Sequence, residues 1–148
     1  MDNTFEDDET LLRSVKPIEL FMHKDGTLTS AAFKDSDGLS VDRTGDHTLE
    51  QAVEFAQHHL TGVIVGVTVL QCKQVEAVVK YLPVPDNNYH SEIHRNEEKL
   101  RLNDRQAENL SKRAHILNGA KTNGQPSAES PEPTVISIYW PKKNCSDS

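Results

Sequence analysis

Features that would point to several common classes of protein are scarce in this sequence. Its 148 residues include two cysteines, Cys72 and Cys145, which are too few for a disulfide framework and lack the paired spacing of a zinc site. No apolar run approaches the roughly 18 residues of a membrane-spanning helix, and the acidic start lacks the basic residues of a signal or transit peptide. We therefore expect a soluble cytoplasmic protein without a membrane span.

Basic charge is also in short supply. The 16 Lys and Arg residues are outnumbered by 23 Asp and Glu residues, and the net charge is −7. Binding to nucleic acid by phosphate neutralisation needs Lys and Arg gathered on one face. The densest basic group, Lys112 with Arg113, instead fits the last turn of a helix, where cations stabilise the exposed carbonyls. We expect no nucleic-acid partner. Phosphate loops, dinucleotide fingerprints and serine nucleophile elbows are absent as well.

Composition divides the chain into four parts. Residues 1–10 are acidic and carry little apolar surface, which predicts a disordered tail. Residues 15–117 alternate between helical and strand patterns and predict a single α+β domain. Residues 118–133 are rich in Gly, Pro, Ser and Asn, as in a flexible linker. The remainder, 134–148, is predicted to be a C-terminal tail with one β-prone segment, Thr134–Trp140, which holds the only tryptophan.

The predicted domain has two main helices and a small mixed sheet. Thr48 with Gln51, and Asn103 with Gln106, have the spacing of capping boxes, and apolar residues at helical intervals follow each pair. The second helical stripe extends to Leu117. Runs of β-branched or alternating residues, bounded by turns, predict strands at Ile18–Met22, Leu39–Val41, Val63–Val69, Val75–Tyr81 and Tyr89–His94.

The strongest candidate chemistry lies at His90, Glu92 and His94. Residues two apart on a strand point to one face, so these side chains could converge on a metal or a substrate. Imidazole and carboxylate bind zinc, and a His/Glu pair can transfer protons. The same spacing also occurs on the polar face of an ordinary antiparallel strand. Because no further ligand pair is evident, we predict no metal site and take His90 and Glu92 as the candidate catalytic acid–base pair.

Cys72 allows two interpretations. It could be a nucleophile if His58, His59 or His90 were adjacent in space, but a lone cysteine among apolar residues is more often an inert core thiol. For His58 and His59, at the end of the first predicted helix, interaction with the negative end of the helix dipole is the expected role. We expect the core position for Cys72.

Polar residues between Ser30 and Arg43 form a candidate substrate site. Ser30, Ser40 and Arg43 could display polar groups around a pocket, and a guanidinium can donate two parallel hydrogen bonds to a phosphate or carboxylate. The small residues beside Ser30 would allow close approach of the backbone. We therefore name these three residues as candidate substrate contacts, with no cofactor indicated.

Four short segments in this region carry a resemblance to other proteins. They are Ser30–Phe33, Leu39–Arg43, Asn87–Glu92 and Leu110–Ala114. Together the segments resemble a group of small bacterial proteins with no established activity, which share SSAAF and LSV segments, an NPAH-like turn before an acidic residue, and an ARxLAxxA-like helix. Asn88 stands where that group usually has proline, and the C-terminal extension departs from it. The resemblance implies a bacterial or phage-related origin and a compact fold.

Two functions of different class follow. The first is a non-enzymatic protein-interaction or accessory module, in which Thr134–Trp140 adds to the sheet edge of a partner. That segment could equally complete the sheet of its own domain. The alternative is a small enzyme acting on a nucleotide or other polar substrate, with His90 and Glu92 as acid–base pair. The sequence leaves the oligomeric state open.

Overall fold

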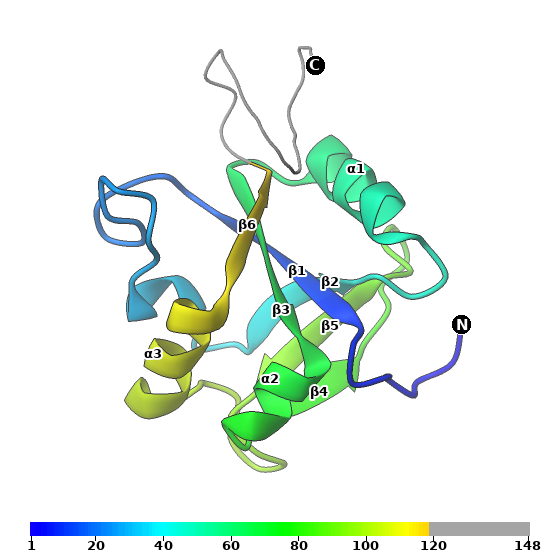
Figure 1. Cartoon of the computed structure of the whole chain (residues 1–148). Helices are drawn as coiled ribbons and strands as arrows, with labels where there is room; N and C mark the ends of the chain where they lie inside the picture. Colours follow the sequence, from blue (N-terminus) through cyan, green and yellow to red (C-terminus); the bar gives the residue numbers. More distant parts are fainter. Residues whose placement is uncertain (119–148) are drawn as a thin grey trace.

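An antiparallel sheet forms the centre of the molecule, in a computed structural model that describes residues 1–118 (Figure 1). Within these residues six strands lie in the order β4-β5-β2-β1-β3-β6, and every strand pair is antiparallel. The strands are β1 (Thr10–Val15), β2 (Leu39–Arg43), β3 (Val63–Thr68), β4 (Val78–Tyr81), β5 (His90–His94) and β6 (His115–Asn118). The helices are the short 3-10 helix η1 (Ser30–Phe33), then α1 (Leu49–His59), α2 (Val69–Gln74) and α3 (Asp104–Arg113). The predicted α+β class with two main helices is confirmed, but within residues 1–118 the sheet is antiparallel throughout and not mixed as predicted.

Strand β1 lies at the centre of the sheet, although the sequence predicted no strand there. It pairs with β2 through Leu11 opposite Arg43 and with β3 over its whole length. Leu11 and Leu12 are both fully buried, and they point to opposite faces. A strand covered on both faces has consecutive apolar residues in place of alternation. The sequence pattern did not identify β1, because it has only two consecutive leucines and follows an acidic segment.

Each face of the sheet has its own apolar core. The face that carries Leu11, which we call the α3 face, packs against residues of η1, α2 and α3, including the fully buried Phe33 and Leu110. The opposite face, which we call the α1 face, packs Leu12 and Ile64 against Ala52 and Ala56 of α1. Figure 1 shows α1 standing apart from α2 and α3. Since α1 is a single helix, it covers only part of its face.

Both predicted capping boxes are present. The Gln51 N–H donates to the Thr48 hydroxyl at 3.1 Å, and the Thr48 N–H donates to the Gln51 side-chain oxygen at 2.9 Å. Asn103 and Gln106 repeat this arrangement at the start of α3. Each box satisfies N–H groups that the first turn of a helix leaves without partners. A third box, at Thr68 and Gln71, begins α2.

Helix α3 ends earlier than predicted. Its last residue is Arg113, and Ala114 is already extended at φ −68° and ψ 145°. Residues 115–118 form β6, which pairs with β3 through Val65 opposite Ile116. The expected continuation of the helix to Leu117 is therefore wrong, because pairing with the edge of β3 overrides a helical spacing that Leu117 fits by coincidence.

The other predicted strands are found with altered ends. The runs Val63–Val69 and Tyr89–His94 correspond to β3 and β5, whereas Val75–Tyr81 is shortened to β4 because a turn through Glu76, at φ 64°, follows α2. Ile18–Met22 forms no strand. Met22 makes an isolated bridge to Leu28 around the turn at Gly26.

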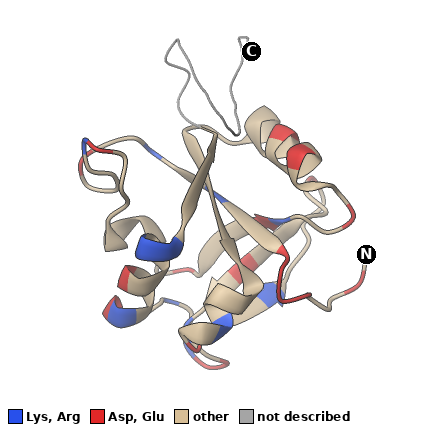
Figure 2. Cartoon of the chain, viewed as in Figure 1, with Lys and Arg blue, Asp and Glu red and all other residues tan. Residues whose placement is uncertain are grey.

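Two further observations bear on function. Along the ribbon in Figure 2, Lys and Arg positions are interspersed with Asp and Glu positions. No helix within residues 1–118 combines the length and the apolar character that crossing a bilayer requires. The segment Thr134–Trp140 and most of the predicted linker lie outside the described residues.

Candidate functional site

His90, Glu92 and His94 share one face of β5, as their spacing predicts. The register places Glu92 opposite Ser40 and His90 opposite Asp42, so all these side chains belong to the α1 face. Glu92, however, pairs with His94, whose Nε2 lies 2.8 Å from the Glu92 Oε1 atom. The turn at Gly38 covers this pair so closely that a Cβ atom there would lie 2.6 Å from the Glu92 Oε1. Glu92 is thus engaged and half-buried.

His90 also makes a structural contact. Its Nδ1 atom lies 2.8 Å from the carbonyl oxygen of Leu82. A carbonyl only accepts hydrogen bonds, so Nδ1 carries the proton and the ring ties β5 to the residue that follows β4. No described hydrogen bond joins His90 to Glu92. The two residues share a face but do not form the direct acid–base pair that the sequence suggested.

Arg43, predicted to contact a substrate anion, is buried on the α3 face. Because Asp42 pairs with His90 and successive strand residues alternate, Arg43 points away from His90. Its Nε and Nη2 atoms each donate to the Glu9 carboxylate at 2.9 Å, and the residue is 4% exposed. A guanidinium held in this way has no free pair of N–H groups to donate to a phosphate. The structure gives Arg43 a structural role in place of the predicted substrate contact.

The same guanidinium fixes the N-terminal segment, where a disordered tail of residues 1–10 was predicted. Nη1 donates to the Asp2 carbonyl at 2.6 Å, and Nη2 donates to the Thr4 carbonyl at 2.8 Å. The Phe5 and Tyr81 rings lie 4.2 Å and 4.9 Å from its central carbon, close enough for cation–π attraction. The tail prediction is corrected here. The composition of residues 1–10 could not reveal this order, because Arg43, which holds the segment, lies in another strand.

Ser30 and Ser40 lie on different elements and do not meet Arg43. Ser30 begins η1, and Ser40 is exposed on the α1 face. Arg13 links the two segments, because its Nε donates to the Ala32 carbonyl at 2.9 Å and its Nη1 donates to the Ser40 carbonyl at 3.0 Å. Burial lowers the pKa of this guanidinium, an effect that Asp35 opposes. The three candidate substrate residues therefore do not converge, because Ser40 and Arg43 point to opposite faces of β2 and Ser30 lies on another element.

A polar cluster that the sequence did not predict surrounds the buried Asp42. Its Oδ1 accepts a hydrogen bond of 2.9 Å from the Asn87 side chain, and its Oδ2 lies 2.9 Å from the Nε2 of His59. The other ring nitrogen of His59 lies 2.8 Å from the Phe55 carbonyl. That contact bears out the helix-end role expected for His59. The contact between His59 and Asp42 ties the end of α1 to β2.

Cys72 occupies the core position that we expected. It is fully buried in the α3-face core, and burial raises the pKa of its thiol to about 12. The thiolate is the reactive form of cysteine. A buried thiol with so high a pKa does not act as a nucleophile near neutral pH.

This assignment predicts a slow reaction of Cys72 with thiol reagents. In a Cys145→Ser variant, which leaves a single thiol, an aromatic disulfide reagent should modify the native protein far more slowly than the urea-unfolded protein at the same pH. The reason is that a thiol of pKa about 12 is ionised in only about 1 molecule in 100,000 at pH 7. Absorbance of the released thiolate gives both rates. Equal rates would contradict a core role for Cys72.

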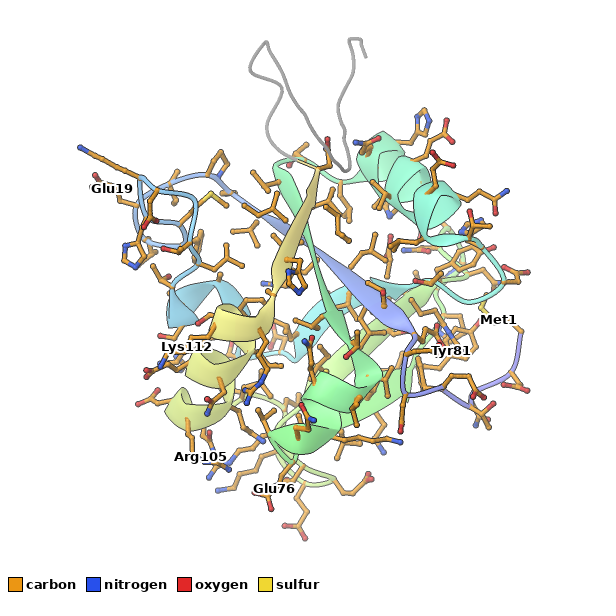
Figure 3. All side chains as sticks on the ribbon, in the orientation of Figure 1. Met1, Glu19, Glu76, Tyr81, Arg105 and Lys112 are labelled. Atoms are coloured by element: carbon orange, nitrogen blue, oxygen red, sulfur yellow. The ribbon has the colours of Figure 1, made fainter. Side chains whose placement is uncertain are left out.

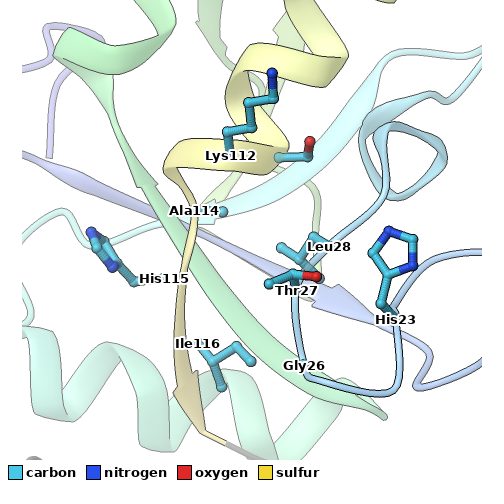
Figure 4. A pocket seen from close by; sticks show the side chains of 9 residues that line it. His23, Gly26, Thr27, Leu28, Lys112, Ala114, His115 and Ile116 are labelled. Atoms are coloured by element: carbon cyan, nitrogen blue, oxygen red, sulfur yellow. The ribbon is translucent and has the colours of Figure 1, made fainter.

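A groove lies beside β6, on the α3 face of the sheet. Its walls are the turn that contains His23 and Gly26–Leu28, the end of α3 at Ser111–Lys112, and residues Ala114–Ile116, and it encloses about 520 Å³. Figure 4 shows Ile116 directed toward the side of the Gly26 turn, with His115 on the other side of the strand. A Cβ atom at Gly26 would be in ordinary contact with Ile116, at 3.9 Å. The groove therefore combines an apolar wall with a polar rim.

The strand beside this groove is an open edge. Within the described residues β6 pairs with β3 alone, so alternate N–H and C=O groups of β6 point outward. The opposite edge, β4, carries Lys80 paired with Glu97 and is followed by Pro83 and Pro85, features that hinder the addition of a strand. β6 has neither lysine nor proline, and its Ile116 is 46% exposed.

The groove was not predicted, because residues 114–117 were assigned to a helix. A signal was available in Lys112 and Arg113, which are typical of a final helical turn and would have allowed a strand to begin at His115. Within residues 1–118 no group of three or more His, Cys, Asp or Glu side chains could hold a metal ion. Comparisons of the chain with protein-family models, curated proteins and solved structures found no match.

Proposed function

We propose that this protein is a non-enzymatic interaction module that binds an extended polypeptide segment along β6. The observation that carries the proposal is the coincidence of an open strand edge with a groove beside it. Strand addition needs both parts, since backbone hydrogen bonds from the edge supply affinity and pockets for alternate side chains supply specificity. At the opposite edge, β4, the paired Lys80 and the prolines that follow hinder strand addition.

The lining of the groove indicates the chemistry of its ligand. Leu28 and Ile116 offer apolar contact, whereas His23 offers a hydrogen-bonding group at the rim. Lys112 already pairs with Glu108 at 3.1 Å. An uncharged segment with β-branched or aromatic residues at every second position suits this surface, because its apolar side chains enter the groove while its backbone pairs with β6.

The alternative of a small enzyme has less support. It needs His90 and Glu92 as a working pair, with Ser30, Ser40 and Arg43 around the same substrate. Among the described residues Glu92 pairs with His94 instead, and Arg43 lies on the other face. We therefore favour binding over catalysis, and we keep the bacterial, cytoplasmic setting as part of the same proposal.

A display library of seven-residue peptides tests the binding function. Selection on the full chain should enrich sequences that alternate β-branched or aromatic residues with polar ones. An Ile116→Lys substitution should weaken the selected peptides about tenfold or more, since loss of about 1.4 kcal/mol of edge contact has that effect. Fluorescence polarisation of labelled peptides measures the affinities.

A substitution of equal exposure elsewhere provides the control. Leu100 is 44% exposed, close to the value for Ile116, and lies outside the groove lining. Leu100→Lys should leave peptide affinity unchanged. If both lysine variants bound the selected peptides as tightly as the original chain, β6 would not be the binding edge.

A further inference from the structure

We infer that the occupant of the β6 groove is the chain's own segment Thr134–Trp140, which adds to the edge of β6 through Thr134–Ser137 in the same molecule and so occludes the site. The inference rests on the proposed function and adds a regulatory step to it. An external partner would have to displace this internal strand before it could bind. Three observations carry the inference: the pattern of the segment, its distance along the chain, and the direction in which β6 ends.

The pattern of the segment fits the groove. If this segment formed a strand, alternate side chains would point to the same side. One side would carry Thr134, Ile136, Ile138 and Trp140 and would be mainly apolar, and the other would carry Val135, Ser137 and Tyr139. No residue from Thr134 to Trp140 carries a charge at neutral pH. The segment therefore matches a groove that has Leu28 and Ile116 in its wall and no unpaired carboxylate in its lining.

The chain length between the two strands allows their pairing. β6 ends at Asn118, which leaves the 15 residues 119–133 before Thr134. A coil of this length spans roughly 20 Å, more than the few ångströms that separate neighbouring strands. Connections of this kind hold the second partner at an effective concentration in the millimolar range. Pairing within one molecule is thus favoured over pairing between molecules at micromolar concentration.

The direction of β6 sets the orientation that we expect for the added strand. The chain leaves β6 at Asn118, so a return alongside its open edge is antiparallel, like every other pair in this sheet. A return that begins with Thr134 opposite Asn118 brings Ile136 opposite Ile116. Both residues would then contribute apolar surface at the same point of the strand pair.

Trp140 is the only tryptophan in the chain and therefore reports on the segment without labels. In the full chain we expect blue-shifted emission and weak quenching by acrylamide. Ile116→Lys should shift the emission to the red and raise the quenching to that of a free tryptophan derivative, whereas Leu100→Lys should change neither. The double substitution Ile136→Asp with Ile138→Asp should also expose Trp140 and leaves the sequence of residues 1–118 unchanged. Circular dichroism checks that each variant is folded.

Several outcomes would overturn the inference. Emission from the unaltered chain that matches free tryptophan would mean that the segment is not docked. Protection that persists in Ile116→Lys would place the segment elsewhere. Protection that disappears on dilution, together with a dimer by light scattering, would make a second copy the occupant.

Peptide binding separates this inference from the proposed function. If the internal strand occludes the groove, the Ile136→Asp/Ile138→Asp chain should bind the selected peptides more tightly than the unaltered chain. Equal binding to both chains would refute occlusion and leave the binding function intact. If no peptide bound either chain through Ile116, both proposals would fail.

Discussion

Replacing Arg43 with methionine is expected to lower the free energy of unfolding by about 3–5 kcal/mol. This is the usual cost of removing one partner from a buried ion pair, because the other charge is left without compensation. Here the Glu9 carboxylate, on a side chain only 10% exposed, would lose both of its bonds from the guanidinium. The Asp2 and Thr4 carbonyls would lose their donors as well. Urea unfolding followed by circular dichroism measures the change.

An exposed ion pair provides the matched control. Arg105 and Glu76 lie 3.1 Å apart, at the periphery of the molecule (Figure 3), with side chains 59% and 81% exposed. Arg105→Met should therefore cost at most about 1 kcal/mol. The double variant Glu9→Gln/Arg43→Met should recover part of the lost stability, because the unpaired Glu9 carboxylate is then replaced by a neutral amide. If Arg43→Met were as stable as Arg105→Met, the N-terminal segment would not be held as described.

Phe33→Ala is the second substitution with a large expected effect, a loss of about 3–5 kcal/mol in the free energy of unfolding. Phe33 is 1% exposed, and it packs from η1 into the α3-face core. Truncating a buried phenylalanine removes its transfer free energy and leaves a cavity that the surroundings fill only in part. Thermal and urea unfolding both report the loss.

Ser30→Ala, three residues earlier, distinguishes packing from polar function in this segment. Ser30 is half-buried at the start of η1, and no side-chain hydrogen bond is described for it. We expect Ser30→Ala to change the free energy of unfolding of the protein by less than about 0.5 kcal/mol. A Phe33→Ala protein within 1 kcal/mol of the unaltered chain would show that η1 does not pack on the sheet as described.

Helix starts were predictable because their signals are local. Thr48 with Gln51, and Asn103 with Gln106, lie within single helical turns, and the hydrogen bonds that they form depend on little else. The shared face of His90, Glu92 and His94 was predictable for the same reason, since alternation is a property of any regular strand. These features need no knowledge of the rest of the chain.

Features that depend on distant partners were not predictable. β6 forms because β3 offers an edge about 50 residues earlier in the chain, at Val65 opposite Ile116. The N-terminal segment is ordered because Arg43 lies 34 residues after Glu9. The pairing of Asp42 with His59 likewise joins a strand to the end of a helix. In each case the local pattern allows another structure, and long-range contact decides between them.

The contrast between the two sheet edges limits how this molecule can polymerise. A fibril built by strand addition requires each subunit to offer two accepting edges, because every addition must leave a fresh one behind. Here Lys80 and the prolines after β4 block one side, and β6 is the accepting side. Two copies that met through β6 would consume both of their accepting edges, so growth would stop at a closed, twofold-symmetric dimer.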